Sequence, residues 1–187
     1  MTEMMMLNKA IAVAADAHNR QFRKDSGLPY LLHPLEGVLM LQRDGCTDEA
    51  TLCIMALHDT CESDASKRMS YSYIERMVGS REVADGVKLM TCTDDMNKDD
   101  YIKSFITGPI NALVVKLYDR YINVEDFNRC KEINNSYYTK YANKGLPVIE
   151  AAIARVAEVD AAFGVSFAHQ MRYRASYLKD LAGLHIG

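Results

Sequence analysis

Apolar residues recur along most of the chain at the three- and four-residue spacing of an α-helix, and strand-like runs are few. The pattern predicts an all-α protein, a single-domain helical bundle. The expected helices cover residues 4–19, open at His33-Pro34, run from Asp48 into His58-Asp59, begin at a capping box Ser72–Glu75, run from Ser80 to near Met90 and from Lys98 to Thr107, begin near Asn111, and follow the apolar stripe from Ile149 to Phe163. Pro34, Pro109 and Pro147 are expected in first turns, where a missing N–H has no helical partner.

The composition is that of a globular protein whose 187 residues form one domain, 1–187. The net charge of -3 argues against a dedicated nucleic-acid-binding protein, so we expect no nucleic-acid partner. No apolar run approaches the roughly 20 residues of a membrane helix, so we also expect no membrane partner. The five scattered cysteines include no CxxC pair, and the N-terminus lacks a signal-peptide pattern. These features predict a cytoplasmic protein in a reducing compartment.

The candidate chemistry rests on histidines and carboxylates, because the chain has no glycine-rich phosphate loop and no G-x-S-x-G elbow. His58 and Asp59 close the apolar segment LCIMALHD, and His33 stands at the start of a predicted helix. Asp119 lies in an apolar helical segment, where a carboxylate is costly unless it is paired or bound to a metal.

Two imidazoles and two carboxylates on separate helices form a donor set that suits Mn²⁺, Fe²⁺ or Zn²⁺ with open water positions. Such an ion lowers the pKa of water and polarises a phosphoryl oxygen. Glu62 follows His58 by four residues, one helical turn, and is expected to orient or deprotonate that water. The residues thus predict a metal-dependent phosphohydrolase.

Four stretches resemble the HD superfamily and, more narrowly, the hydrolase domain of the RelA/SpoT-type alarmone enzymes and their stand-alone small alarmone hydrolases. They are AADAHNRQFRKDSGLPYLLHPLEG, ALHDTCESD, REVADGVKLMT and KLYDRYINVED, and they lie within residues 10–127. Residues 128–187 are expected to form helices that complete an HD-type bundle. In the multidomain enzymes a synthetase domain follows, and the length of this chain fits the hydrolase-only form.

The resemblance implies Mn²⁺-dependent removal of the 3′-pyrophosphate from guanosine tetra- or pentaphosphate (ppGpp or pppGpp), a small-molecule nucleotide substrate. It leaves Zn²⁺ and Fe²⁺ as other metals and the oligomeric state open. The implied metal ligands are His33, His58, Asp59 and Asp119. Glu62 and Asn123 would position the attacking water, and Arg23, Lys24, Tyr30 and Asn123 would bind the nucleotide. A planar guanidinium at Arg23 suits stacking on the base, while the ammonium of Lys24 suits phosphate.

Two positions depart from the family pattern. Ser63 stands where the family has an aspartate after Glu62, and Tyr118 stands where an alanine usually precedes the metal-binding aspartate. Serine lacks the charge of a carboxylate, so two alternatives stay open. In the first alternative, the chain is an HD phosphohydrolase for another nucleotide, such as NADPH or a deoxynucleotide monophosphate. In the second, it is a nucleotide-binding protein with weakened catalysis.

Several polar and aromatic residues are interpreted as structural. His18 is expected to be satisfied by one hydrogen bond, His169 and His185 to lie outside the site, and Cys61 to point away from the face of Glu62. Tyr137 and Tyr138, with Lys140 and Lys144 beyond them, are more typical of core packing than of a substrate lid.

Overall fold

The computed structural model describes residues 5–24, 26–62, 65–93, 95–129 and 135–183, with the side chains of 127–129, 135–140, 142 and 183 outside the description. The elements are α1 (Met6–Ala17), α2 (Leu32–Arg43), α3 (Glu49–Leu57), α4 (Tyr71–Ile74), the π-helical turn η1 (Glu75–Gly79), α5 (Arg81–Met90), α6 (Lys98–Ile106), α7 (Ile110–Arg129), α8 (Asn135–Ala154), α9 (Val156–Phe163) and α10 (Val165–Gly183). Within the described ranges there is no strand, only one isolated bridge between Phe22 and Pro29. The predicted all-α class is confirmed.

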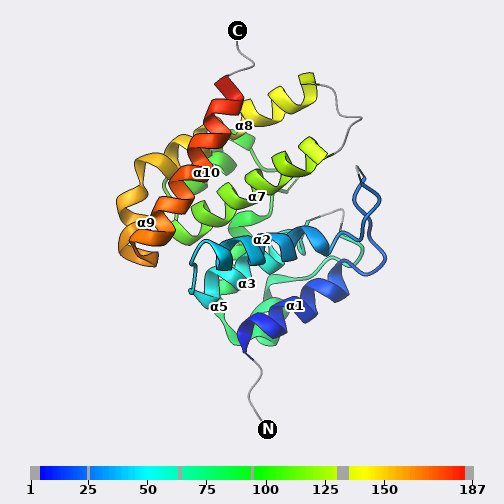
Figure 1. The fold of residues 1–187 in the computed structure, drawn as a ribbon. Coiled ribbons are helices and arrows are strands. Elements are labelled where there is room, and N and C mark those ends of the chain that lie inside the picture. Colours follow the sequence, from blue (N-terminus) through cyan, green and yellow to red (C-terminus); the bar gives the residue numbers. More distant parts are fainter. Residues whose placement is uncertain (1–4, 25, 63–64, 94, 130–134, 184–187) are drawn as a thin grey trace.

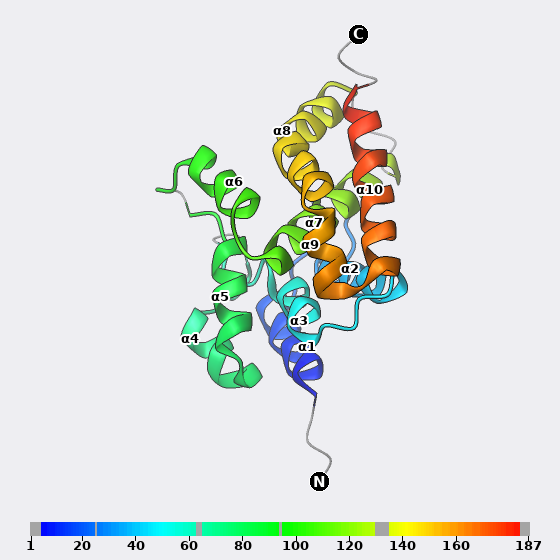
Figure 2. The same ribbon diagram turned by 90° about the vertical axis from the view of Figure 1, so that its left-hand side faces the viewer.

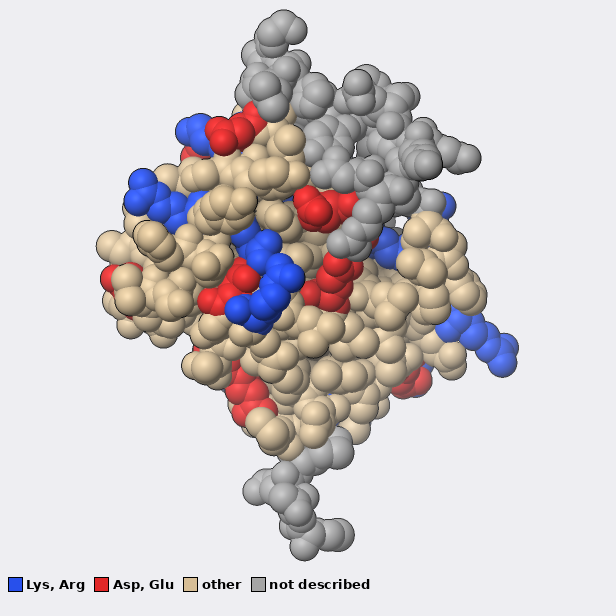
Figure 3. Space-filling model, viewed as in Figure 1, with Lys and Arg blue, Asp and Glu red and all other residues tan. Residues whose placement is uncertain are grey.

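The arrangement places α1 at one end of the molecule and α8 and α10 at the other, with α2 and α3 between them (Figures 1 and 2). On the face shown in Figure 3, basic and acidic side chains of the described residues are interspersed, and neither sign forms a broad patch. Among the described residues, no helix is both long and apolar enough to cross a bilayer.

Helix α3 forms the centre of the core. Its residues from Ala50 to Leu57 are all buried, as expected of a helix that is apolar on every side. It packs against α1, α2, α5 and α7. Two glycines permit this close packing, because a Cβ at Gly37 of α2 would meet Met55 Cε at 1.8 Å and one at Gly86 of α5 would meet Ile54 Cδ1 at 2.3 Å. The result is that His58, directly after α3, lies deep in the molecule.

The helix starts agree with the sequence signals where a polar side chain caps them. Asp48 accepts a hydrogen bond from the Thr51 N–H at the start of α3, Ser80 caps α5, and Asn97 caps α6. The proposed capping box at Ser72 is wrong, because Ser70 is the residue that caps α4. Helix α3 also ends at Leu57, so His58 and Asp59 follow the helix instead of belonging to it.

The C-terminal stripe spans two helices and not one. Helix α8 ends at Ala154 and α9 begins at Val156, so the apolar positions from Ile149 to Phe163 cross a break at Arg155. Pro147 lies inside α8 rather than in a first turn. The Arg155 guanidinium turns back to donate to the carbonyl oxygens of Ile106 and Gly108, at 3.1 and 2.9 Å. The break therefore serves to join the C-terminal helices to the end of α6.

Candidate metal centre

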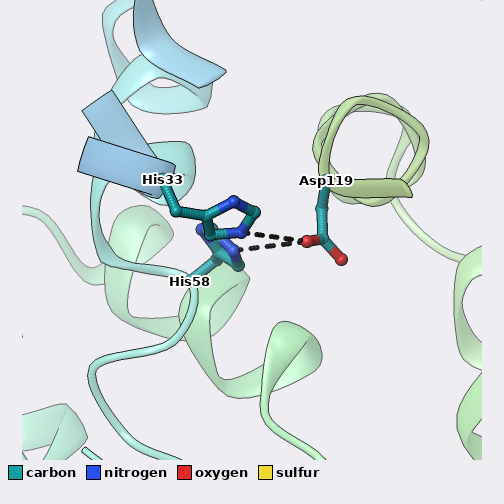
Figure 4. Close-up of side chains that lie close together, drawn as sticks. All are labelled: His33, His58 and Asp119. Carbon is teal, nitrogen blue, oxygen red and sulfur yellow. Dashed lines mark ion pairs between the residues drawn. The ribbon is translucent and has the colours of Figure 1, made fainter. Parts of the chain in front are cut away.

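Three helices bring two imidazoles and a carboxylate together. His33 lies in the first turn of α2, His58 follows α3, and Asp119 lies in α7. Both imidazoles point at the same carboxylate oxygen, with Asp119 Oδ1 at 3.3 Å from His33 Nε2 and 3.6 Å from His58 Nε2 (Figure 4). All three residues are buried, and their candidate ligand atoms lie within 4.8 Å of one another.

Asp59, the fourth predicted ligand, lies near both imidazoles but outside the group of three whose atoms lie within 4.8 Å of one another. Its Oδ2 lies 3.1 Å from His58 Nε2 and 3.8 Å from His33 Nε2. The Tyr30 hydroxyl donates a hydrogen bond to the same oxygen at 2.7 Å. Tyr30, expected to bind the nucleotide, thus holds a candidate metal ligand in place, and its ring packs on His18 with 4.8 Å between centroids.

The donor atoms fit a divalent cation. His58 donates from Nδ1 to the Met55 carbonyl oxygen at 2.7 Å, which in the neutral ring leaves a lone pair on Nε2. Within the described residues, that buried Nε2 has no hydrogen-bond partner, although two carboxylates face it. Two imidazoles and two carboxylates match Mn²⁺, Fe²⁺ or Zn²⁺ by ligand type.

The electrostatics of the centre are those of a site prepared for positive charge. Burial lowers the pKa of His58, but the carboxylates of Asp59 and Asp119 outweigh burial and raise that pKa to about 10. Burial opposes ionisation of Asp119 too, yet Lys116 and the two histidines hold its pKa well below the ordinary value. Asp119 is therefore a carboxylate, and protons compete with a metal for His58.

Lys116 is a component of the site that was not predicted from the sequence. Its ammonium donates to Asp119 Oδ2 at 3.1 Å and lies 5.5 Å from the Tyr101 ring centroid. This leaves Asp119 Oδ1 turned toward the imidazoles. A lysine three residues before a carboxylate in an apolar helix is the signal that predicts such a buried pair.

Asn123 and Arg23 form a chain of contacts leading from the centre to the surface. Asn123 Nδ2 donates to Asp119 Oδ1 at 2.7 Å, and Asn123 Oδ1 accepts from Arg23 Nη2 at 3.2 Å. Arg23 also pairs with Asp126 at 2.8 Å and lies over the Tyr30 ring. Asn123 is thus in contact with a metal ligand, and its predicted role toward water stays a prediction.

The remaining predicted residues lie around this centre. Glu62 follows a turn and not a regular helix, and its Oε1 accepts from the Cys92 N–H at 2.9 Å. Lys24 is exposed in the loop between α1 and α2. The His18 side chain makes one hydrogen bond, between Nδ1 and Gln21 Oε1 at 2.8 Å, but within the described residues its buried Nε2 has no partner, so one hydrogen bond does not satisfy it. His169 is exposed on α10. Ser63, His185 and the side chains of Tyr137, Tyr138 and Lys140 lie outside the described residues.

A cleft of about 830 Å³ lies between α6, α7 and α8, and its lining includes none of the four candidate metal ligands. Four cationic side chains and one carboxylate line it: Lys98, Lys103, Arg120, Lys144 and Asp99. Tyr101 and Tyr141 belong to the same lining, and the Arg120 guanidinium lies over the Tyr141 ring at 4.6 Å. Apart from Lys144, these residues were not singled out in the sequence analysis, because they come from three separate helices.

Comparison with known proteins agrees with this architecture. No family model matches the sequence. The chain is 31% identical over 136 residues to GTP pyrophosphokinase rsh of Brucella ovis, which covers 68% of this chain and 18% of that protein. It is 32% identical over 136 residues to guanosine-3′,5′-bis(diphosphate) 3′-pyrophosphohydrolase MESH1 of Mus musculus, covering 69% of this chain and 73% of that protein.

The chain thus spans less than a fifth of the length of the Brucella ovis protein, since the match covers 18% of that protein. A solved structure of a metazoan ortholog of SpoT, described as hydrolysing ppGpp, shares the fold with a TM-score of 0.71 at 19% identity, covering 93% of this chain and 96% of that one. The resemblance to the RelA/SpoT-type hydrolase domain is therefore confirmed, and the chain belongs to the family of the MESH1 guanosine-3′,5′-bis(diphosphate) 3′-pyrophosphohydrolases.

Proposed function

We propose that this protein is a metal-dependent hydrolase that removes the 3′-pyrophosphate of ppGpp or pppGpp, releasing GDP or GTP and pyrophosphate. The observation that carries the proposal is the convergence of His33, His58 and Asp119, with the buried Nε2 of His58 directed at carboxylates. The MESH1 relative of Mus musculus is named for this reaction.

His33, His58, Asp59 and Asp119 would hold the cation, which we propose to be Mn²⁺, with Zn²⁺ and Fe²⁺ as the alternatives. A divalent cation at this position supplies a Lewis acid that acidifies water and polarises a phosphoryl oxygen. The residues around it fix the ligands: Tyr30 holds Asp59, and Lys116 and Asn123 hold the two oxygens of Asp119.

Two groups are proposed to act on the attacking water. Glu62 would accept its proton, and the Cys92 N–H that donates to Glu62 Oε1 limits the rotation of that carboxylate. Asn123 would orient the water from its position against Asp119. The water oxygen would bond to the phosphorus attached to the nucleotide 3′-oxygen as the P–O bond to that oxygen breaks. The 3′-oxygen would keep the bonding electron pair and take up the proton accepted by Glu62, giving a hydroxyl and free pyrophosphate.

The cleft supports an anionic substrate of nucleotide size. Its volume of about 830 Å³ is within the range of small-molecule sites, and its four cationic residues complement a polyphosphate. The wall of the cleft reaches the centre through Tyr101, which contacts Lys116, and through Cys92, which contacts Glu62. Arg23 would stack on the base and Lys24 would meet phosphate, both from the loop between α1 and α2.

The deciding experiment is release of pyrophosphate from ppGpp with and without Mn²⁺, with products separated by chromatography. We expect the wild type to be active only with the metal, and His58→Ala and Asp119→Ala to be inactive. Lys179→Met is the matched control, because Lys179 pairs with Glu150 on the surface at 3.3 Å, away from the centre. Mn²⁺-dependent release retained by either alanine variant would refute the metal assignment.

The same assay separates the two alternatives. Fast turnover of NADPH or a deoxynucleotide monophosphate with none of ppGpp would assign the centre to another nucleotide. Tight binding of ppGpp with negligible turnover would indicate a binding protein, and a large gain in rate in Ser63→Asp would locate the deficit at that position.

The setting we propose is the cytoplasm, where the thiols stay reduced. Cys46, Cys53, Cys61 and Cys92 are free, and the first three are buried. Burial raises the pKa of Cys53 to about 12 and that of Cys61 to about 11, so neither is a reactive thiolate at neutral pH.

A further inference from the structure

A buried charged cluster joins three helices on the side of α7 away from the metal centre. Asp44 caps the C-terminus of α2, Tyr118 belongs to α7, and Arg174 belongs to α10. We call these three residues the Asp44 clasp. Asp44 and Arg174 are each 6% exposed and Tyr118 is 0% exposed.

Tyr118 and Arg174 both donate hydrogen bonds to the Asp44 carboxylate. Arg174 Nη2 donates to Asp44 Oδ1 at 2.7 Å, and Arg174 Nε donates to Asp44 Oδ2. The Tyr118 hydroxyl donates to Asp44 Oδ2 at 2.8 Å. The Tyr118 ring stacks on Phe167 of α10, with planes 10° apart and centroids at 5.9 Å. An ion pair this deeply buried is favourable only when its hydrogen bonds are complete, and here they fix one relative position of the three helices.

Two of these three helices, α2 and α7, also carry residues of the metal centre. Helix α2 carries His33 in its first turn and Asp44 at its C-terminus, and α7 carries Asp119 directly after Tyr118. Successive residues point about 100° apart around a helix, so Tyr118 reaches α10 and Asp44 while Asp119 faces the imidazoles. Fixing Tyr118 to Asp44 therefore fixes both the translation of α7 along α2 and its rotation, which together set the 3.3 Å between Asp119 Oδ1 and His33 Nε2.

We propose that the Asp44 clasp positions Asp119 for metal binding, with Tyr118 and Arg174 as positioning residues. The inference rests on the proposed metal centre and extends it to α10, which lies beyond the stretches that resemble the family. It also gives Tyr118, the departure from the family's alanine, a function that alanine has no atoms to perform.

The test measures Mn²⁺ affinity without any nucleotide, by titration calorimetry or by the loss of the free Mn²⁺ electron-spin signal. Tyr118→Phe keeps the ring stacked on Phe167 and deletes one hydrogen bond, so it is the variant that folds most safely. We expect it to raise the Kd for Mn²⁺ by about 3- to 10-fold, somewhat less than the 10- to 100-fold typical of groups bonded directly to a ligand. Arg174→Met should raise the Kd further, and Arg174→Lys, which keeps the charge but not the fork, should restore part of the affinity.

Two controls separate positioning from stability. Lys179→Met removes an exposed ion pair between α10 and α8 and should leave the Kd unchanged. Val78→Ala, in η1, lowers the melting temperature through a buried residue remote from the clasp, and should also leave the Kd unchanged well below that temperature.

The outcomes are distinct. A raised Kd in the clasp variants with unchanged controls supports the proposal. Clasp variants that melt earlier but bind Mn²⁺ as the wild type does would show the clasp to be structural only, with the proposed function intact. A wild type that binds none of Mn²⁺, Zn²⁺ and Fe²⁺ overturns the proposed function and this inference together.

Discussion

Replacing Lys116 with methionine removes the fixed positive charge beside Asp119 and keeps a side chain of similar length. The side chains of Lys116 and Asp119 are only 11% and 8% exposed, and their N–O distance is 3.1 Å. The Lys116 ammonium lies over the rings of Tyr101 and Phe105, at 5.5 and 5.6 Å from their centroids, so methionine also removes the attraction of that charge to the two rings. The change therefore isolates the contribution of charge.

The size of the effect follows from this geometry. At an effective dielectric constant of about 20, unit charges at that separation attract by about 5 kcal/mol. Breaking a buried pair from one side costs about 3–5 kcal/mol, since the other charge stays buried. In the metal-free protein, His58 is protonated and offsets part of the loss, because its pKa is about 10. We therefore expect the free energy of unfolding to fall by about 3 kcal/mol, the lower end of that range.

Thermal unfolding followed by circular dichroism, in a chelator and in excess Mn²⁺, measures the effect. For a chain of this length, about 3 kcal/mol corresponds to a lower Tm by roughly 6–12 °C in the chelator. Mn²⁺ provides positive charge at Asp119 and no longer competes with the Lys116 ammonium, so it should raise the Tm of Lys116→Met more than that of the wild type. Lys179→Met, with its exposed pair, should behave as the wild type.

Two results would refute this reasoning. A variant as stable as the wild type in chelator would mean that Lys116 does not compensate Asp119. An equal rise in Tm with Mn²⁺ in both proteins would mean that the metal and the ammonium do not act on the same carboxylate.

Three further predictions concern the centre and the core. Tyr30→Phe deletes the hydrogen bond to Asp59 and should raise the Kd for Mn²⁺ about 10-fold in a nucleotide-free titration, whereas an unchanged Kd would show that Asp59 needs no such support. Mn²⁺ binding should release about one proton from His58 at neutral pH, and the affinity for Mn²⁺ should therefore fall as the pH is lowered. Calorimetry in buffers of different ionisation enthalpy counts the released protons, and a count of zero would contradict the raised pKa of His58. Gly86→Ala should destabilise the fold by about 1–3 kcal/mol in urea unfolding. Adding Ile54→Val should recover part of that loss, because it removes the Cδ1 atom that the new Cβ would meet at 2.3 Å. Additive effects of the two substitutions on the free energy of unfolding would exclude the clash.

The sequence predicts the helices well where a cap and an apolar period agree. Helix α5 is a good example, because Ser80 caps it and its buried positions follow one face. The end of α3 was harder to place, because the pattern stays apolar up to His58 while the backbone leaves the helix at Leu57. The single stripe from Ile149 to Phe163 fails for a related reason, since periodicity does not register a change of helix axis at Arg155.

The metal centre shows what residue types in a pattern can and cannot indicate. The convergence of His33, His58 and Asp119 was predictable, because few other chemistries use two imidazoles and a carboxylate in apolar surroundings. The cleft was not predictable from the sequence, because Lys98, Arg120 and Lys144 come from helices whose relative placement no local pattern encodes. Tyr30 was assigned to the nucleotide from its motif, and only the fold shows its hydroxyl on Asp59.

The burial of α3 from Ala50 to Leu57 has a consequence for motion as well as for packing. A helix covered on every side has no face from which it can fray separately, so its amide protons exchange with solvent only when the whole fold opens. His58 follows this helix directly, so its backbone is held by the same packing. The loop that carries Arg23 and Lys24 is a turn at the surface, and its amides exchange through local openings. Hydrogen exchange would thus divide the site into a slow half that contains His58, a candidate metal ligand, and a fast half that contains the proposed nucleotide contacts Arg23 and Lys24.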